Sequence, residues 1–111
     1  MLGKTVKVKI DRPIGTIHNG ITYPLNYGYV EDLVALDGEF QDAYVIDLDK
    51  QKNEIVGNVI GIIQRINDIE DKLIVSTTSK EYTVAEIESI VKFQEQYFTH
   101  EICLSKDQHF K

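Results

Sequence analysis

Cysteine, proline and positive charge are scarce in this sequence, and tryptophan is absent. The single cysteine, Cys103, excludes an intramolecular disulfide framework and a zinc site made of several thiolates. Arg12 and Arg65 are the only arginines and the formal net charge is −6, so the basic face typical of nucleic-acid-binding proteins is not expected. No stretch approaches the roughly 18 consecutive apolar residues that span a bilayer, so no membrane partner is expected either.

Several catalytic and targeting motifs are missing as well. The sequence contains no G-x-S-x-G nucleophile elbow, no G-x-x-x-x-G-K phosphate loop and no G-x-G-x-x-G dinucleotide fingerprint. These absences argue against the serine hydrolases and nucleotide-binding folds that depend on such loops. The N-terminal residues also lack the apolar segment of a secretory signal, which favours a cytoplasmic location.

The residues that are present are typical of one globular domain covering positions 1–111. The composition is 42% hydrophobic and 27% charged, which is ordinary for a folded protein. Five segments rich in β-branched and aromatic residues predict strands, and in the first of them apolar and polar residues alternate with a period of two. The predicted strands are Val6–Ile10, Ile21–Val30, Ala43–Leu48, Ile55–Ile66 and Lys72–Thr77.

One helix is predicted late in the chain. Thr83 and Glu86 form the T-x-x-E capping box that starts many helices, and Ile87 and Val91 continue an apolar stripe at helical spacing. The pattern predicts a helix that runs from Thr83 to about Tyr97–His100. Five or six strands followed by one helix predict a mainly β (α+β) fold, a small closed OB-like β-barrel with one C-terminal α-helix packed against it.

Acidic residues gather in the middle of the chain, where seven of the eighteen lie between Glu31 and Asp49. Asp37, Glu39 and Asp42 flank a glycine turn at a spacing that can aim three carboxylates at one point. Carboxylates that converge repel one another strongly unless a cation lies between them, and oxygen ligands alone favour Mg²⁺. The alternative is a set of solvated turn residues.

A second acidic cluster and an aromatic segment accompany the first. Asp68, Glu70 and Asp71 follow the fourth predicted strand, and Tyr23 and Tyr27 lie upstream of the central acidic residues. Tyrosine hydroxyls can donate to phosphate oxygens while their rings pack, although such rings also suit a barrel core. A carboxylate-bound metal that activates water is the chemistry that this residue set supports.

The segment YPLNYGYVEDLVALDGEFQD, residues 23–42, resembles the soluble inorganic pyrophosphatases of the single-domain β-barrel type. That family carries Tyr-Pro-x-Asn-Tyr-Gly-[Phe/Tyr] and, after a short spacer, Asp-Gly-Asp-Pro-x-Asp. Residues 8–16, 59–75 and 86–101 are similar to the family's opening strand, its second acidic turn and its C-terminal helix. On this resemblance the chain is a shortened member.

The resemblance implies Mg²⁺-dependent hydrolysis of pyrophosphate to two phosphates by metal-activated water, in a homo-oligomer. The implied metal ligands are Asp37, Glu39, Asp42, Asp68 and Asp71. The implied catalytic residues are Glu39, Tyr27 and Lys72. The implied phosphate-binding residues are Arg12, Tyr23, Lys72 and Tyr97.

The sequence departs from the family pattern at several points. Glu39 stands in place of an aspartate, Phe98 in place of a lysine, and the β-hairpin that follows the family's first strand is expected to be absent. Two alternatives to pyrophosphate hydrolysis therefore stay open. One is hydrolysis of another phosphoanhydride, and the other is a barrel that binds a metal or ligand without catalysis.

Overall fold

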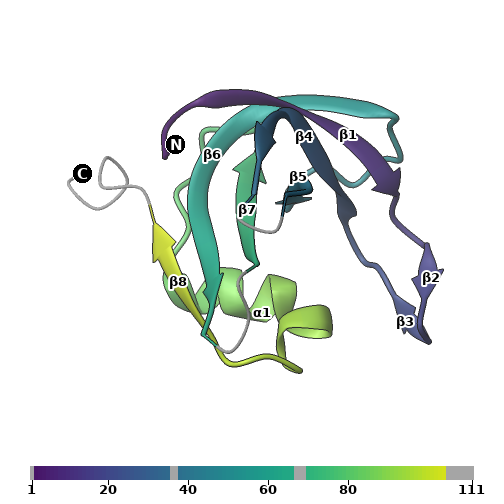
Figure 1. Cartoon of the computed structure of the whole chain (residues 1–111), viewed down its shortest axis with the longest axis vertical. Helices are drawn as coiled ribbons and strands as arrows, with labels where there is room; N and C mark the ends of the chain where they lie inside the picture. Colours follow the sequence, from purple (N-terminus) through teal and green to yellow (C-terminus); the bar gives the residue numbers. More distant parts are fainter. Residues whose placement is uncertain (1, 36–37, 67–69, 105–111) are drawn as a thin grey trace.

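A closed five-stranded barrel forms the body of the protein in the computed structural model, which describes residues 2–35, 38–66 and 70–104 (Figure 1). Its strands follow the order β1-β4-β5-β7-β6, and β6 pairs back onto β1 to close the ring. Strands β5 and β7 are parallel, and the other pairs are antiparallel. The expected closed barrel is confirmed. The strands are β1 Thr5–Arg12, β4 Asn26–Val34, β5 Phe40–Val45, β6 Glu54–Arg65 and β7 Asp71–Ser76.

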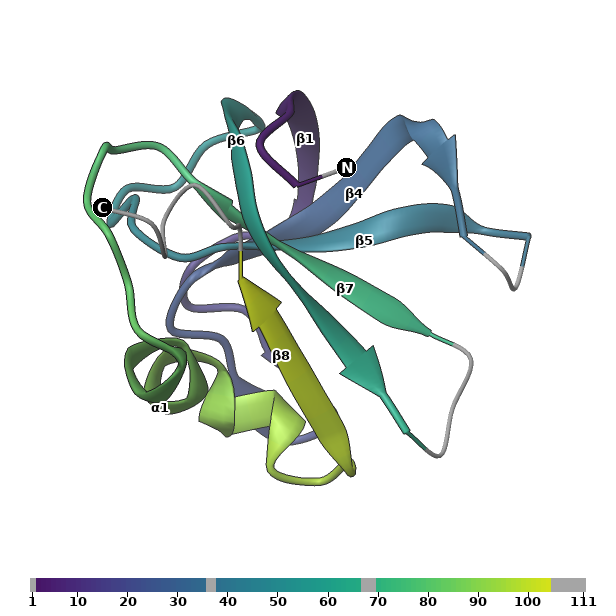
Figure 2. The same ribbon diagram turned by 90° about the vertical axis from the view of Figure 1, so that its left-hand side faces the viewer.

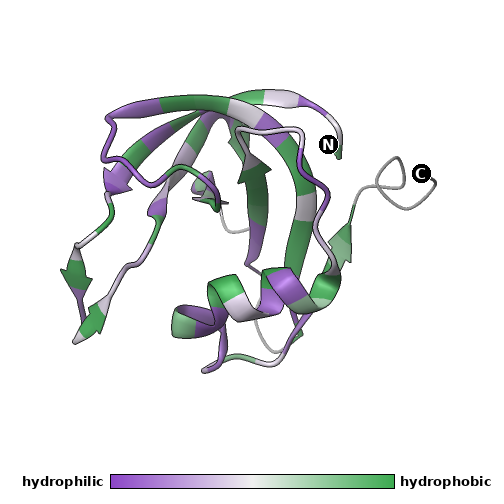
Figure 3. Ribbon diagram, turned by 180° about the vertical axis from the view of Figure 1, so that it is seen from behind, coloured by the Kyte–Doolittle hydropathy of each residue, from purple (hydrophilic) through white to green (hydrophobic). Residues whose placement is uncertain are grey.

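The predicted helix begins where the capping box placed it. Helix α1 spans Val84–Glu95, the Thr83 hydroxyl accepts from the Glu86 amide, and the Glu86 carboxylate accepts from the Thr83 amide. Helix α1 and the barrel strands carry both hydrophobic and hydrophilic residues (Figure 3). No helix within the described ranges is long and apolar enough to cross a bilayer.

The end of the helix was predicted wrongly. Helix α1 stops at Glu95 with Gln96 as its C-cap, and His100–Leu104 form a further strand, β8. Strand β6 is twelve residues long and bonds β1 only through its first half, so its second half offers an open edge that β8 fills (Figure 2). Pairing of that edge satisfies backbone groups that a longer helix would have left unpaired.

The absence of a hairpin after the first strand was also predicted wrongly. Strands β2, Ile17–His18, and β3, Ile21–Thr22, pair antiparallel and extend from the barrel (Figure 1). The two residues between them, Asn19 and Gly20, have φ of 52° and 79°. An Asn-Gly pair with positive φ is the usual two-residue hairpin turn, so this short hairpin follows from local turn chemistry.

The two faces of the barrel sheet bury different side chains. Successive side chains along a strand point to opposite faces, so the strands carry two sets of side chains. The buried residues of one set are all aliphatic. The other face packs against α1 and is rich in tyrosine. The aliphatic set is Val8, Val30, Ala43, Val45, Ile55, Val59, Leu73 and Val75. The second set is Tyr23, Leu25, Tyr27, Tyr44, Ile63, Ile74, Tyr82, Ile87, Val91 and Leu104.

Candidate active site

A pocket of about 270 Å³ opens at the edge of the tyrosine-rich face, between the β2–β3 hairpin, the barrel strands and α1. Within the described residues, three cationic side chains and two carboxylates face it, although the chain as a whole carries a net negative charge. Its lining residues are Arg12, His18, Asn19, Ile21, Tyr27, Asp42, Arg65, Glu70, Lys72 and Gln94.

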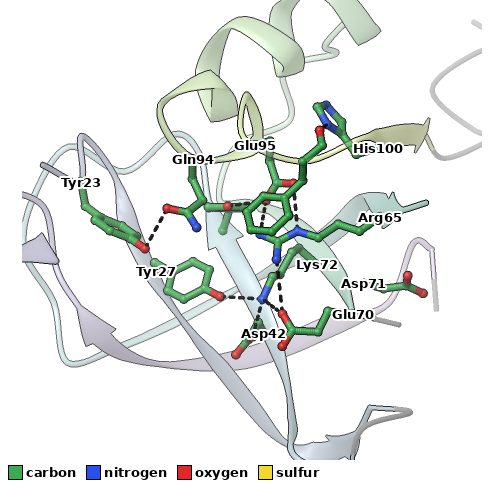
Figure 4. A network of polar contacts seen from close by, with 12 residues as sticks. Tyr23, Tyr27, Asp42, Arg65, Glu70, Asp71, Lys72, Gln94, Glu95 and His100 are labelled. Atoms are coloured by element: carbon green, nitrogen blue, oxygen red, sulfur yellow. Dashed lines mark hydrogen bonds and ion pairs between the residues drawn. The ribbon is translucent and has the colours of Figure 1, made fainter. Parts of the chain in front are cut away.

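Lys72 is the centre of the polar contacts in this pocket (Figure 4). Its side chain is only 4% exposed, and its Nζ lies 2.6 Å from Asp42 Oδ2 and 2.8 Å from Glu70 Oε1. The Tyr27 hydroxyl accepts a third hydrogen bond from Nζ at 3.0 Å. Three neighbouring strands supply these groups, since β4 carries Tyr27, β5 carries Asp42 and β7 carries Lys72. We call Lys72, Asp42, Glu70 and Tyr27 the lysine network.

The contacts in the lysine network set the charge state of its members. Burial by itself would lower the pKa of Lys72, but Tyr27, Asp42 and Glu70 outweigh it and hold that pKa above its ordinary value. Burial raises the pKa of Tyr27 well above that of a free phenol. At neutral pH the site therefore contains a fixed ammonium beside a neutral hydroxyl.

A second network lies deeper, beside the first. Arg65, the last residue of β6, donates from Nε to Glu95 Oε1 at 3.1 Å and from Nη2 to Oε2 at 2.8 Å. The Tyr44 hydroxyl donates to the same Glu95 carboxylate at 2.7 Å. The Phe98 ring stacks on the guanidinium, with its centroid 3.6 Å from Arg65 Cζ. We call Arg65, Glu95, Tyr44 and Phe98 the arginine network. The two networks touch where Arg65 Nη1 lies 3.4 Å from Glu70 Oε1.

Arg12 reaches the pocket from β1. Its Nη1 donates to the Tyr23 hydroxyl at 2.7 Å, and its guanidinium lies over the rings of Tyr23 and Tyr27. The Tyr23 hydroxyl donates in turn to Gln94 Oε1 on α1 at 3.4 Å. Tyr23 is buried and does not line the pocket, so in this structure its hydroxyl holds Arg12 in place.

The structure brings some of the sequence-predicted site residues together and leaves others outside. Arg12, Tyr27, Asp42 and Lys72 line one pocket. Glu39 is exposed on the turn before β5, and Tyr97 is 65% exposed after α1; neither belongs to the lining residues. Two predicted ligands, Asp37 and Asp68, lie outside the described residues.

The expected convergence of Asp71 with Asp42 is not found, and Glu70 stands there instead. Glu70 and Lys72 lie two positions apart and face the same side, so Asp71 between them points away from the lysine network (Figure 4). The backbone carbonyl of Asp71 accepts from the Gln41 side chain at 2.6 Å, which joins β7 to β5. The two-residue period of a strand starting at Asp71 could have revealed this exchange.

Sequence reasoning also missed the arginine network. In the sequence, Arg65 stands out only as one of two arginines, because no short motif marks it. A weak signal existed for Glu95, which follows Ile87 and Val91 at helical spacing and so places an acid on the buried stripe of α1. An acid at such a position needs a buried cation as a partner.

The donor set can be compared with the needs of a divalent cation. Within residues 2–35, 38–66 and 70–104, no three His, Cys, Asp or Glu side chains form a group that could hold a metal. Two carboxylates, those of Asp42 and Glu70, face the pocket and are each 35% exposed. Mg²⁺ is commonly held by one or two carboxylates together with water and substrate oxygens, so this pair fits a hard divalent cation.

Comparisons with known proteins concern the fold. A scan of family models and a sequence search of curated proteins each found no match. Solved structures of inorganic pyrophosphatases share the architecture. That from Ehrlichia chaffeensis has a TM-score of 0.67 at 15% identity, over 97% of this chain and 90% of its own. Those from Neisseria gonorrhoeae and Coxiella burnetii have TM-scores of 0.66 and 0.64 at 16% identity, covering 95% of this chain and 85% and 86% of theirs. At this identity the likeness shows that the chain has the inorganic pyrophosphatase fold.

Proposed function

We propose that this chain hydrolyses inorganic pyrophosphate with the help of a divalent cation, Mg²⁺ by preference. The observation that carries the proposal is a pocket in an acidic protein where Arg12, Arg65 and Lys72 face Asp42 and Glu70. The three cationic side chains suit an anionic substrate, and the two carboxylates suit a divalent cation that accompanies it. The fold, seen in proteins described as inorganic pyrophosphatases, supports the same activity.

The role of each residue follows from charge. Bound Mg²⁺ would neutralise part of the pyrophosphate charge and lower the pKa of a coordinated water. Asp42 and Glu70 would hold the ion. When these carboxylates turn from Lys72 to the ion, the Lys72 ammonium would become able to bind a phosphate oxygen. Tyr27 would orient Lys72 through their hydrogen bond. Arg12, which lines the pocket, would contact the substrate and stabilise charge on the leaving phosphate.

A release assay tests the proposal directly. Purified protein is given pyrophosphate with Mg²⁺, and phosphate is measured before and after chelation of the metal. We expect release that stops on chelation and that falls by about 100-fold or more in Asp42→Asn. The matched control is Asp32→Asn, an exposed aspartate on β4 outside the pocket, which should keep wild-type activity. Equal and negligible release by wild type and Asp42→Asn would favour a non-catalytic barrel.

Hydrolysis of another phosphoanhydride is a second candidate, favoured by the uncharged residues that line part of the pocket. Besides charged groups, the lining includes Ile21 of the hairpin and the Gln94 amide, which could contact an organic substituent on a phosphate. The same assay with nucleoside diphosphates and triphosphates separates the two candidates. Faster release from a nucleotide than from pyrophosphate would make the nucleotide the substrate.

Two further expectations belong with this proposal. We propose a homo-oligomer, to be measured by light scattering of the purified protein. We also propose the cytoplasm as the location, to be measured by cell fractionation.

A further inference from the structure

We infer that Arg65 is a fixed phosphate-binding residue of the pocket, held in position by Glu95 and Phe98. Neither Arg65 nor Glu95 is among the site residues that the resemblance implies, and Phe98 stands where the family pattern has a lysine. The inference rests on the proposed function for the identity of the anion, but its main readout is binding of inorganic phosphate and does not require hydrolysis.

The position of Arg65 combines burial with access to the pocket. The residue is 7% exposed, yet it lines the pocket together with Lys72 and Arg12. Its Nε and Nη2 are directed at Glu95, on the side of α1, whereas Nη1 is directed at Glu70, on the side of the lysine network (Figure 4). One edge of the guanidinium is therefore anchored and another edge faces the place where substrate would bind.

Three contacts restrict the guanidinium plane. The paired bonds to Glu95 fix two of its nitrogens, and the Phe98 ring covers one of its faces at 3.6 Å. The Tyr44 hydroxyl fixes the Glu95 carboxylate itself. A planar group held in this way loses little freedom when it binds an anion, whereas the flexible ammonium of a lysine would lose more.

The depth of Glu95 indicates that the pair serves Arg65 rather than stability. Its side chain is 0% exposed, and a buried ion pair usually stabilises a fold no better than apolar residues of the same size. A buried guanidinium without a counterion would destabilise the fold further. A buried carboxylate behind Arg65 therefore keeps a cation at this wall, with the Nη1 edge of the guanidinium toward Glu70 and the pocket.

The outer contact is the one that can exchange. Nη1 lies 3.4 Å from Glu70 Oε1, longer than either bond to Glu95, and Glu70 also contacts Lys72 at 2.8 Å. When Glu70 turns to a divalent cation, a phosphate oxygen can take its place beside Nη1. Arginine forks suit phosphate oxygens well, so the anion would be held by Arg65 and Lys72 together.

The test compares phosphate binding and turnover in a charge-matched variant. Arg65→Met combined with Glu95→Gln removes both charges of the pair, keeps the net charge and leaves no buried ion without a partner. With Mg²⁺ present, we expect the dissociation constant of inorganic phosphate and the KM for pyrophosphate to rise about 10-fold or more. A folded double variant whose two constants stay within about 2-fold of wild type would overturn the inference.

A second variant covers the case in which the double variant does not fold. Arg65→Lys keeps a positive charge beside Glu95, but one ammonium cannot bind Glu95 and phosphate with the same fork geometry. We expect a KM raised about 5-fold with a smaller change in kcat, because binding rather than chemistry is impaired. An unchanged KM in folded Arg65→Lys would contradict a phosphate-binding role.

The two readouts keep this inference apart from the proposed function. Wild type that binds phosphate without releasing it from pyrophosphate would end the proposed function, and loss of that binding in the double variant would still support Arg65. Wild type that turns over pyrophosphate, together with variants that bind phosphate as well as it does, would end the inference alone. Wild type that neither binds phosphate nor releases it from pyrophosphate would end both.

Discussion

The lysine and arginine networks contain the same chemical parts at different depths. Each joins a cation, carboxylate oxygens and a tyrosine hydroxyl. In the lysine network the carboxylates of Asp42 and Glu70 are 35% exposed, whereas the Glu95 carboxylate of the arginine network is 0% exposed. Exposed carboxylates can leave their lysine for a solvated ion, because water and ion replace the lost contact. A buried carboxylate has no such replacement, so it positions a neighbour and does not exchange.

The largest difference between the networks should appear in stability. Glu95→Ala leaves Arg65 buried without its counterion, and we expect a loss of about 3–5 kcal/mol in the free energy of unfolding. Glu70→Ala leaves Lys72 paired with Asp42, and we expect a loss of only about 1 kcal/mol. Urea denaturation of both variants measures the contrast. Equal losses would mean that burial does not separate the two networks.

Activity should depend more on the lysine network than on the arginine network. Lys72→Met removes the cation that would bind substrate, and we expect phosphate release to fall about 100-fold, equivalent to about 2.7 kcal/mol of transition-state stabilisation. Its unfolding free energy should change less than that of Glu95→Ala, since water can reach Asp42 and Glu70. Steady-state kinetics and urea titration of the same sample check both parts. Near-normal release with a large loss of stability would assign Lys72 to the structure instead.

Deleting one hydroxyl from each network makes a finer comparison. Tyr44→Phe takes a hydrogen bond from a fully buried carboxylate, with an expected loss of about 2 kcal/mol in stability. Tyr27→Phe takes an acceptor from Lys72, which retains two carboxylates, and we expect about 0.5–1 kcal/mol. Thermal and urea unfolding give both values. A costlier Tyr27→Phe would contradict the expectation that a lost contact destabilises the protein more in the deeper network.

The smallest effect is expected from pH. Hydrogen bonds and ion pairs outweigh burial and hold the pKa of Lys72 and that of Arg65 above their ordinary values, so neither cation loses its proton near neutrality. His100 does: burial alone would lower its pKa, but the Phe98 carbonyl and Glu88 raise it above 6.5. The stabilising contribution of protonated His100 is then complete below its ordinary pKa and is lost as pH rises through the raised one.

His100→Gln tests this pH dependence. We expect the substitution to cost about 0.5 kcal/mol more at about pH 5.5 than at about pH 9, since the Glu88 partner is half exposed. Urea titrations of wild type and variant at the two pH values give the difference. A cost that is larger at high pH would mean that the neutral imidazole is the favoured form.

Local patterns explain which parts of the fold were predictable. The alternation in β1 and the Thr83 capping box depend on residues a few positions apart, and both were predicted from the sequence. Strand β8 depends on an edge of β6 that β1 leaves open, so its cause lies far away in the sequence. The local pattern therefore predicted a helix ending at about Tyr97–His100 and gave no sign of the strand that follows it.

The same distinction holds in the site. Tyr27, Asp42 and Lys72 lie in segments that resemble a family pattern, and the fold gathers them at one pocket. Arg65 and Glu95 are 30 positions apart and meet only because α1 packs beside the end of β6. No short motif records such a pair. The placement of Glu70 rather than Asp71 beside Lys72 is of a different kind, since it depends only on the two-residue period of the strand.

Closure of the barrel through β1 and β6 also constrains the order of folding. Thr5 meets Asn58, which is 53 positions away, so the first strand finds its second neighbour only when the middle of the chain is available. The parallel pairing of β5 with β7 likewise waits for β6 to pass between them in the sequence. Long loops must close before such contacts form, which slows folding. On the ribosome, the barrel would therefore assemble late and as a unit, and the apolar residues of β1 would need protection until β6 has emerged.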